Sequence, residues 1–177
     1  MPLKYLLSSF AIVVTSLVVL SILSNIPERT KSVTLNEIIA VYNKLCTLKD
    51  VSLSCDVNIY NIESELRIGD IKLKITRIKI VFPIEYSLPF NGTYRGKPFA
   101  LTGKGIVSWV VLNDNGETLT IKYFYSEVSR SSILSFEEEV EKVFKGVFNA
   151  DIVVDGQHIY KLQGYRTIVL IRIHVKG

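Results

Sequence analysis

The chain has 177 residues, with 21 Lys and Arg against 17 Asp and Glu, giving a formal net charge of +4. This excess is too mild to predict nucleic-acid binding, which needs a stronger and more clustered basic surface. Gly and Pro number only 10 and 5 and no repeat is visible, which argues against a disordered or repetitive chain.

Residues 5–26 contain no Asp, Glu, Lys, Arg or His. As a helix they would be about 33 Å long, slightly more than the roughly 30 Å hydrocarbon core of a bilayer. A cleaved signal is the alternative, but the best cleavage site, after Ser24, has Ile22 where a small residue is expected. We therefore predict three parts: a transmembrane anchor over residues 1–27, a neck over 28–33 and a soluble domain over 34–177.

Three small residues, Ser8, Ala11 and Thr15, share one face of the predicted anchor. Small side chains let two helices approach closely in lipid, so this face predicts a partner helix. The alternative is that the hydroxyl groups bond back to their own helix. Because long domains cross membranes largely regardless of flanking charge, we expect a single-pass protein of the cell membrane with an extracytoplasmic domain.

The soluble part begins with a predicted helix over residues 35–47. Thr34 and Glu37 have the spacing of a capping box, in which each side chain accepts from the backbone of the other residue. The following apolar residues recur at helical spacing and define one buried face: Leu35, Ile38, Ile39, Tyr42, Leu45 and Cys46.

The two cysteines, Cys46 and Cys55, are close in the sequence. From Val51 to Ile59 apolar and polar residues alternate, which predicts a strand whose inward face includes Cys55. Both thiols are therefore expected to point toward the core. In an oxidising compartment we predict a disulfide between them; in the cytosol they would be two reduced, buried thiols.

A long strand is predicted over residues 71–82. Its apolar alternation slips by one residue at Thr76 and Arg77, which predicts a β-bulge. With the bulge, one face is basic, and the final predicted strand carries further basic residues. If the two strands are neighbours, these side chains form a stripe for anionic lipid or an acidic partner; otherwise they are solvated sheet faces. The residues are Lys72, Lys74, Arg77, Lys79, Arg172, His174 and Lys176.

Asn91 begins a glycosylation sequon, Asn-Gly-Thr, which is usable only outside the cytosol. A strand is expected over 97–103, and a hairpin over 106–112 and 117–125, closed by a turn rich in Asn and Gly. Ser135 and Glu138 then match a second capping box, followed by apolar residues at helical spacing, so a helix is predicted over 136–149. Strands over 151–155 and 166–176, with a short one at 157–162, complete the chain.

These elements predict an α+β fold, with a mainly antiparallel sheet covered by two amphipathic helices. A β-sandwich with helices at its periphery is the alternative. Strands joined by short turns favour antiparallel pairing.

Catalytic and metal-binding patterns are not found. The possible metal ligands, Cys46, Cys55, His158 and His174, have spacings that match no zinc site. Residues 92–98 resemble a phosphate loop, but with one residue too few between the glycines and Pro98 where a hydroxyl is needed. We therefore predict no enzyme activity, catalytic residue, metal or cofactor.

The expected function is that of a structural or interaction module, an accessory subunit of a cell-envelope complex. Its expected partners are the lipid bilayer and other membrane or envelope proteins, with a homo-oligomer possible and no nucleic acid. A pilin-like filament subunit is the first alternative, because an apolar helix, a proline, a second helix and a sheet follow in that order. A tethered ligand-binding or enzymatic domain is the second.

Overall fold

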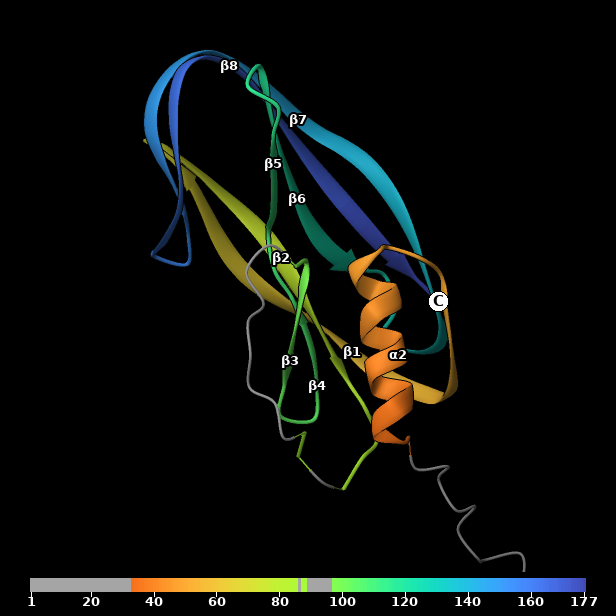
Figure 1. Ribbon diagram of the computed structural model, residues 1–177. Coiled ribbons are helices and arrows are strands. Elements are labelled where there is room, and N and C mark those ends of the chain that lie inside the picture. Colours follow the sequence, from red (N-terminus) through yellow and green to blue (C-terminus); the bar gives the residue numbers. More distant parts are fainter. Residues whose placement is uncertain (1–32, 86, 89–96) are drawn as a thin grey trace, which may run out of the picture. The chain divides into compact units, whose positions relative to one another are not determined.

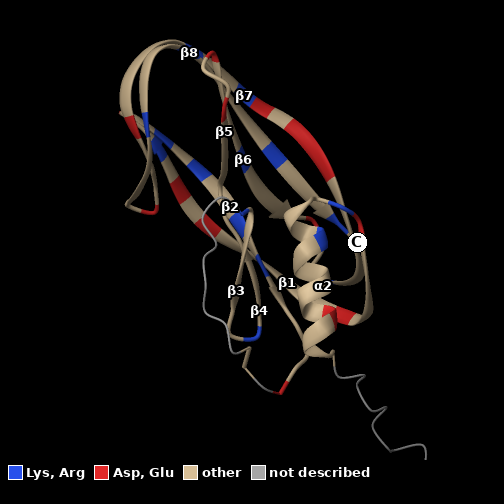
Figure 2. Cartoon of the chain, viewed as in Figure 1, with Lys and Arg blue, Asp and Glu red and all other residues tan. Residues whose placement is uncertain are grey.

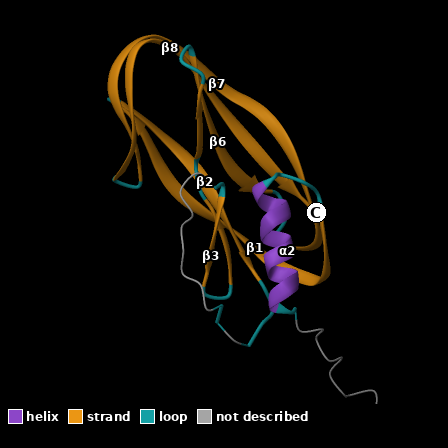
Figure 3. Cartoon of the chain, in the orientation of Figure 1, coloured by secondary structure: helices purple, strands orange, loops and turns teal. Residues whose placement is uncertain are grey.

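Strands make up most of the chain that the computed structural model describes, which comprises residues 33–85, 87–88 and 97–177 (Figures 1 and 3). Within these described residues one helix precedes eight strands, and residues Val33–Gly177 form one compact unit. In order, the elements are α2 (Leu35–Cys46), β1 (Val51–Ile68), β2 (Ile71–Val81), β3 (Phe99–Thr102), β4 (Gly105–Ser108), β5 (Val111–Asp114), β6 (Thr118–Ser126), β7 (Arg130–Val154) and β8 (Gln157–Lys176). The fold is therefore mainly β, and the prediction of an α+β domain with two helices is too helical.

Helix α2 confirms the first predicted helix and its capping box. The Thr34 hydroxyl accepts a hydrogen bond from the Glu37 backbone N–H at 3.3 Å. The Glu37 carboxylate in turn accepts from the Thr34 N–H at 2.8 Å. The helix buries one face, made by Ile38, Val41, Tyr42 and Leu45.

All eight strands belong to one strongly curled sheet, in the order β3-β4-β2-β1-β7-β8-β6-β5 (Figure 1). The pairs β1–β2 and β7–β8 are antiparallel, whereas β6 and β8 run parallel through nine consecutive residue pairs. The sheet is therefore mixed, although most of its pairs are antiparallel as predicted, including β2–β4, β3–β4 and β5–β6. It is one sheet rather than the two of a sandwich. β1 meets β7 at two separate places, once near each end of β7.

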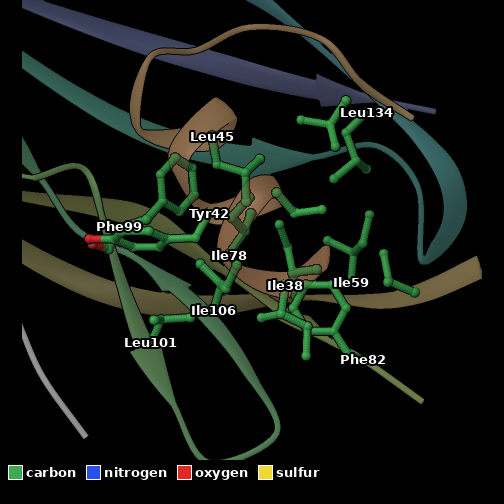
Figure 4. Packing of buried hydrophobic residues seen from close by; sticks show 14 of the residues in the cluster. Ile38, Tyr42, Leu45, Ile59, Ile78, Phe82, Phe99, Leu101, Ile106 and Leu134 are labelled. Atoms are coloured by element: carbon green, nitrogen blue, oxygen red, sulfur yellow. The ribbon is translucent and has the colours of Figure 1, made fainter. Parts of the chain in front are cut away.

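Two hydrophobic cores lie on opposite faces of this sheet. The first, which we call the helix core, packs against α2 (Figure 4) and includes Ile38, Leu45, Val57, Ile59, Ile78, Ile80, Phe82, Phe99, Ile106, Phe124, Leu134, Ile173 and Val175. The second, the distal core, includes Leu66, Ile68, Ile75, Leu119, Ile121, Tyr123, Ile152, Val154, Leu162, Ile168 and Leu170. Strands β1, β2, β6 and β8 each contribute to both cores, so their buried side changes along their length.

The change of side in β2 replaces the predicted β-bulge. The pairing of β1 with β2 continues without a shift from Asn58 and Val81 to Ile68 and Ile71, so the bulge at Thr76 and Arg77 is wrong. Without a bulge, odd and even residues of β2 face opposite sides. Ile75 accordingly enters the distal core and Ile78 the helix core.

Strands β2 and β6 meet where both change their buried side. The Thr76 hydroxyl donates to the Phe124 carbonyl at 2.9 Å. Next to this contact, Asn61 of β1 donates to the Ser126 carbonyl and accepts from the Ser126 N–H, both at 2.9 Å. These bonds tie together strands that are not neighbours in the sheet.

The second predicted helix, over 136–149, is the middle of β7. Its pairing with β8 shifts by one residue between Val140 and Lys142, which marks a bulge at Glu141. A bulge places residues three apart on the same face, so Val140 and Val143 both face one side. This spacing imitates that of a helix, which is why the periodicity was misleading. The valine and phenylalanine residues of the segment suit a strand.

Candidate functional site

A set of charged and aromatic side chains crosses the three adjacent strands β6, β8 and β7. We call it the charged network; its members are Tyr123, Glu127, Glu137, Glu139, Glu141, Arg172, His174 and Lys176. On β8, Arg172, His174 and Lys176 alternate with Ile173 and Val175, which are buried in the helix core. The network therefore occupies the face opposite that core, beside the acidic stretch of β7 (Figure 2).

Tyr123, Glu141 and Arg172 form a closed triangle of hydrogen bonds. The Tyr123 hydroxyl donates to Glu141 at 2.6 Å and accepts from Arg172 Nε at 2.8 Å. Arg172 Nη2 lies 2.9 Å from the other Glu141 oxygen. Burial of the ring, followed by the bond to Glu141, raises the pKa of Tyr123 to about 12. The bond to Tyr123 likewise raises the pKa of Arg172, so the triangle holds a neutral phenol and a charged guanidinium.

His174 lies between two carboxylates. Its Nδ1 is 2.8 Å from Glu127 and its Nε2 is 2.8 Å from Glu139. Only the imidazolium form carries a proton on both nitrogens, so this geometry matches the charged ring. The side chain is 17% exposed, and the ring meets the Tyr125 ring edge-on at a centroid distance of 5.9 Å.

Lys176 pairs with Glu137 at the end of the network. The hydrogen bond from Lys176 lowers the pKa of the Glu137 carboxyl, and the same bond raises the pKa of Lys176. Each cation of the network therefore has a carboxylate partner, and four glutamates face two permanent cations and one histidine. Such an arrangement holds its charges at fixed positions and in fixed directions.

The predicted basic stripe is not assembled as one surface. β1 and β7 lie between β2 and β8, so the two halves are not on neighbouring strands. Within β2, Lys72 and Lys74 face one side and Arg77 and Lys79 the other, because no bulge intervenes. Arg172 and Lys176 belong to the charged network.

Arg77 turns inward rather than toward a partner. Its Nε donates to Ser64 Oγ at 2.8 Å, and its Nη2 lies 2.9 Å from Asp155. Its guanidinium also lies 4.9 Å from the centroid of the Trp109 ring, a cation–π distance. Arg77 therefore fastens β2 to the turn between β7 and β8.

The predicted disulfide is not formed. Cys46 and Cys55 are both free thiols, half-buried at the border of the helix core as expected from their alternation. Burial, followed by the nearby charge of Glu37, raises the pKa of the Cys55 thiol. Its thiolate form, the reactive one, is therefore disfavoured.

Several predicted site residues lie outside the described residues: Ser8, Ala11, Thr15 and Asn91. Within the described ranges, no helix is both long and apolar enough to cross a bilayer. In the same ranges, no three His, Cys, Asp or Glu residues are grouped so as to hold a metal ion.

Glu137, Glu139 and Glu141 of the charged network were missed in the sequence because residues 136–149 were assigned to a helix. A signal was nevertheless present. Glu137, Glu139 and Glu141 alternate, as do Arg172, His174 and Lys176, and two such runs on an antiparallel pair bring opposite charges together.

No protein-family model, curated protein or solved structure matches the chain.

Proposed function

We propose that the chain is a membrane-anchored interaction protein. In this proposal, residues 1–27 hold the β-sheet domain outside the cytoplasm, at the cell membrane, as an accessory subunit of an envelope complex. One observation carries the proposal: residues 5–26 are long enough to span a bilayer and contain no charged residue or histidine.

The surface of the domain supports binding rather than catalysis. The charged network presents carboxylates and cations at fixed positions, each already held by a neighbour on an adjacent strand. Charges fixed in this way select a complementary partner and orient it without reorganising first. Proteins of the envelope and a second copy of the chain are the partners that we propose.

A pilin-like filament subunit is the second candidate. It is favoured by the order of the elements, in which an apolar segment and Pro27 precede α2 and the sheet. Electron micrographs of cells lacking the protein distinguish the two candidates, because unchanged filaments exclude the second.

The subunit proposal is tested by purifying the full chain from detergent extracts of its native membranes at low ionic strength. The expected result is a complex larger than one chain, from which the partner is released by salt because charged surfaces are screened. A lone monomer in the extract, under conditions that keep other envelope complexes intact, contradicts the proposal.

A further inference from the structure

The middle of β7 is an open edge of the sheet. Between Leu134 and Ile152, β7 pairs with β8 on one side, and no described residue of β1 pairs with it on the other. Figure 1 shows this part of β7 as the outermost ribbon on its side of the domain. Residues 137–140 are all exposed, whereas a strand inside a sheet buries alternate residues. Such an edge offers N–H and C=O groups to another strand.

The same segment exposes a row of apolar side chains. Val140, Val143 and Val147 are 60%, 51% and 80% exposed, and Tyr165 beside them is 67% exposed. The three valines pair with Ile171, Val169 and Tyr165 of β8. These partners are all odd-numbered, so the valines and their partners lie on one face of the sheet. Exposed apolar rows of this kind mark surfaces that bind another protein.

The order of charges along the edge identifies the partner. Glu137, Glu138 and Glu139 precede the bulge, and Lys142 and Lys145 follow it. Neither lysine forms an ion pair with any residue of the described part of the chain. An antiparallel second copy of this strand reverses the order, so that the acidic half of each copy faces the basic half of the other.

We propose that this edge binds a second copy of the chain by antiparallel strand addition about a two-fold axis. The register places Val140 opposite Val143 of the second copy, and Glu138 opposite its Lys145. These residues share one face, because their partners on β8 are all odd-numbered. The bulge makes this register possible, since it puts Val140 and Val143 on the same side.

The Glu138 carboxylate remains available in this arrangement. It lies 2.6 Å from Lys122 through one oxygen, and its side chain is 45% exposed. A carboxylate has two oxygens, so the second can accept from Lys145 of the other copy. The two-fold axis makes each contact occur twice, as in other symmetric dimers. This inference rests on the interaction function proposed above and names its partner.

Register-specific cross-linking tests the proposal on the full chain in detergent micelles, with Cys46→Ser and Cys55→Ser in every sample. Val140→Cys and Val143→Cys proteins are purified separately, mixed and oxidised. Opposed residues have Cα atoms about 4.5–5.5 Å apart, within disulfide range. Two identical positions are about 10 Å apart, because they are offset by three residues. Cross-linking in the mixture is therefore expected to be at least about tenfold faster than in either protein alone.

Two results would overturn the proposal. One is no disulfide in the mixture. The other is equal cross-linking in every combination, including a mixture with Tyr60→Cys, whose exposed side chain lies on β1 away from this edge.

A charge-reversal series gives a second, independent readout. Lys145→Glu places two glutamates opposite each other twice per dimer, so self-association is expected to weaken about tenfold. Adding Glu138→Lys to it restores opposite charges and recovers the association. Lys72→Glu makes an equal charge change at an exposed position of β2. It is the control and is expected to leave association unchanged. Failure of the double variant to recover contradicts the register. If cross-linking fails while the chain stays in the membrane fraction, self-pairing is wrong and the anchor proposal stands.

Discussion

Tyr123 is the residue through which the charged network is joined to the core. Its ring is buried in the distal core and its hydroxyl is shared by Glu141 and Arg172. Tyr123→Phe keeps the ring and removes the hydroxyl, leaving two charged groups without that partner. Because hydrogen bonds to charged groups contribute more than neutral ones, the free energy of unfolding should fall by about 2 kcal/mol.

Denaturant titration of the full chain in micelles, followed by fluorescence of the single Trp, measures this change. Tyr125→Phe is the matched control, because no described residue accepts a hydrogen bond from the Tyr125 hydroxyl. Equal effects of the two substitutions would show that the Tyr123 hydroxyl does not stabilise the fold.

The same residue predicts a loss of stability in alkali. The folded-state pKa of Tyr123 is raised from 10.0 to about 12. A raised pKa means that the folded protein keeps the proton longer than the unfolded chain. The stabilisation is therefore complete below pH 10 and is lost as the pH rises from about 10 to about 12. The stability curves of wild type and Tyr123→Phe should converge over this range, and a constant difference would contradict the assignment.

At the residue scale, contacts between residues close in the sequence were predictable, and contacts between distant residues were not. The capping box of Thr34 and Glu37 depends on residues three apart, and the structure confirms it. The half-buried positions of Cys46 and Cys55 also follow from the pattern, but whether the thiols are bonded depends on their orientation in three dimensions. The partners of Arg172 and His174 lie more than thirty residues away on β7, so no local pattern of β8 could identify them.

At the element scale, the least regular feature of the fold is the crossing, by which we mean the place where β1 and β2 contact β6, a strand that is not their neighbour in the sheet. Asn61 makes two hydrogen bonds to the backbone of Ser126 and so joins β1 to β6 where the buried side changes. Asn61→Ala removes both bonds and should destabilise the protein by about 1–2 kcal/mol. Thermal unfolding followed by circular dichroism measures the shift.

Asn58→Ala on the same strand is the control for this prediction. Asn58 is exposed and its side chain takes part in no hydrogen bond with the described residues. Its replacement is expected to change stability by less than about 0.5 kcal/mol. A larger loss for Asn58→Ala than for Asn61→Ala would show that the crossing is held by other contacts.

The elements were predicted well where one face of a strand or helix stays buried along its length. Helix α2 is the example. The errors occurred where the buried side changes. In β2 this change imitated a bulge, and in β7 a real bulge imitated a helix. Periodicity reports which side is buried, and it cannot separate these causes without the pairing partner.

At the scale of the whole molecule, the pairing of distant strands decides the fold class. β6 pairs with β8 although the whole of β7 separates them in the sequence, and β1 pairs with both ends of β7. Such pairing is invisible to local turn signals, which favoured an antiparallel sheet with two helices. The strands predicted from alternating apolar and polar residues nevertheless indicated a β-rich domain, which the described residues confirm.

The central proposal for the molecule is that an uncharged N-terminal segment keeps a β-sheet domain at a membrane. Alkaline carbonate extraction of membranes from cells that produce the full chain tests it most directly, because carbonate releases peripheral proteins and leaves spanning segments in the bilayer. We expect the full chain in the membrane pellet, and a variant with Val13→Lys and Val18→Lys in the supernatant, since a charged residue inside a bilayer costs roughly 2.5–3.5 kcal/mol. Recovery of the unaltered chain in the supernatant would contradict the proposal.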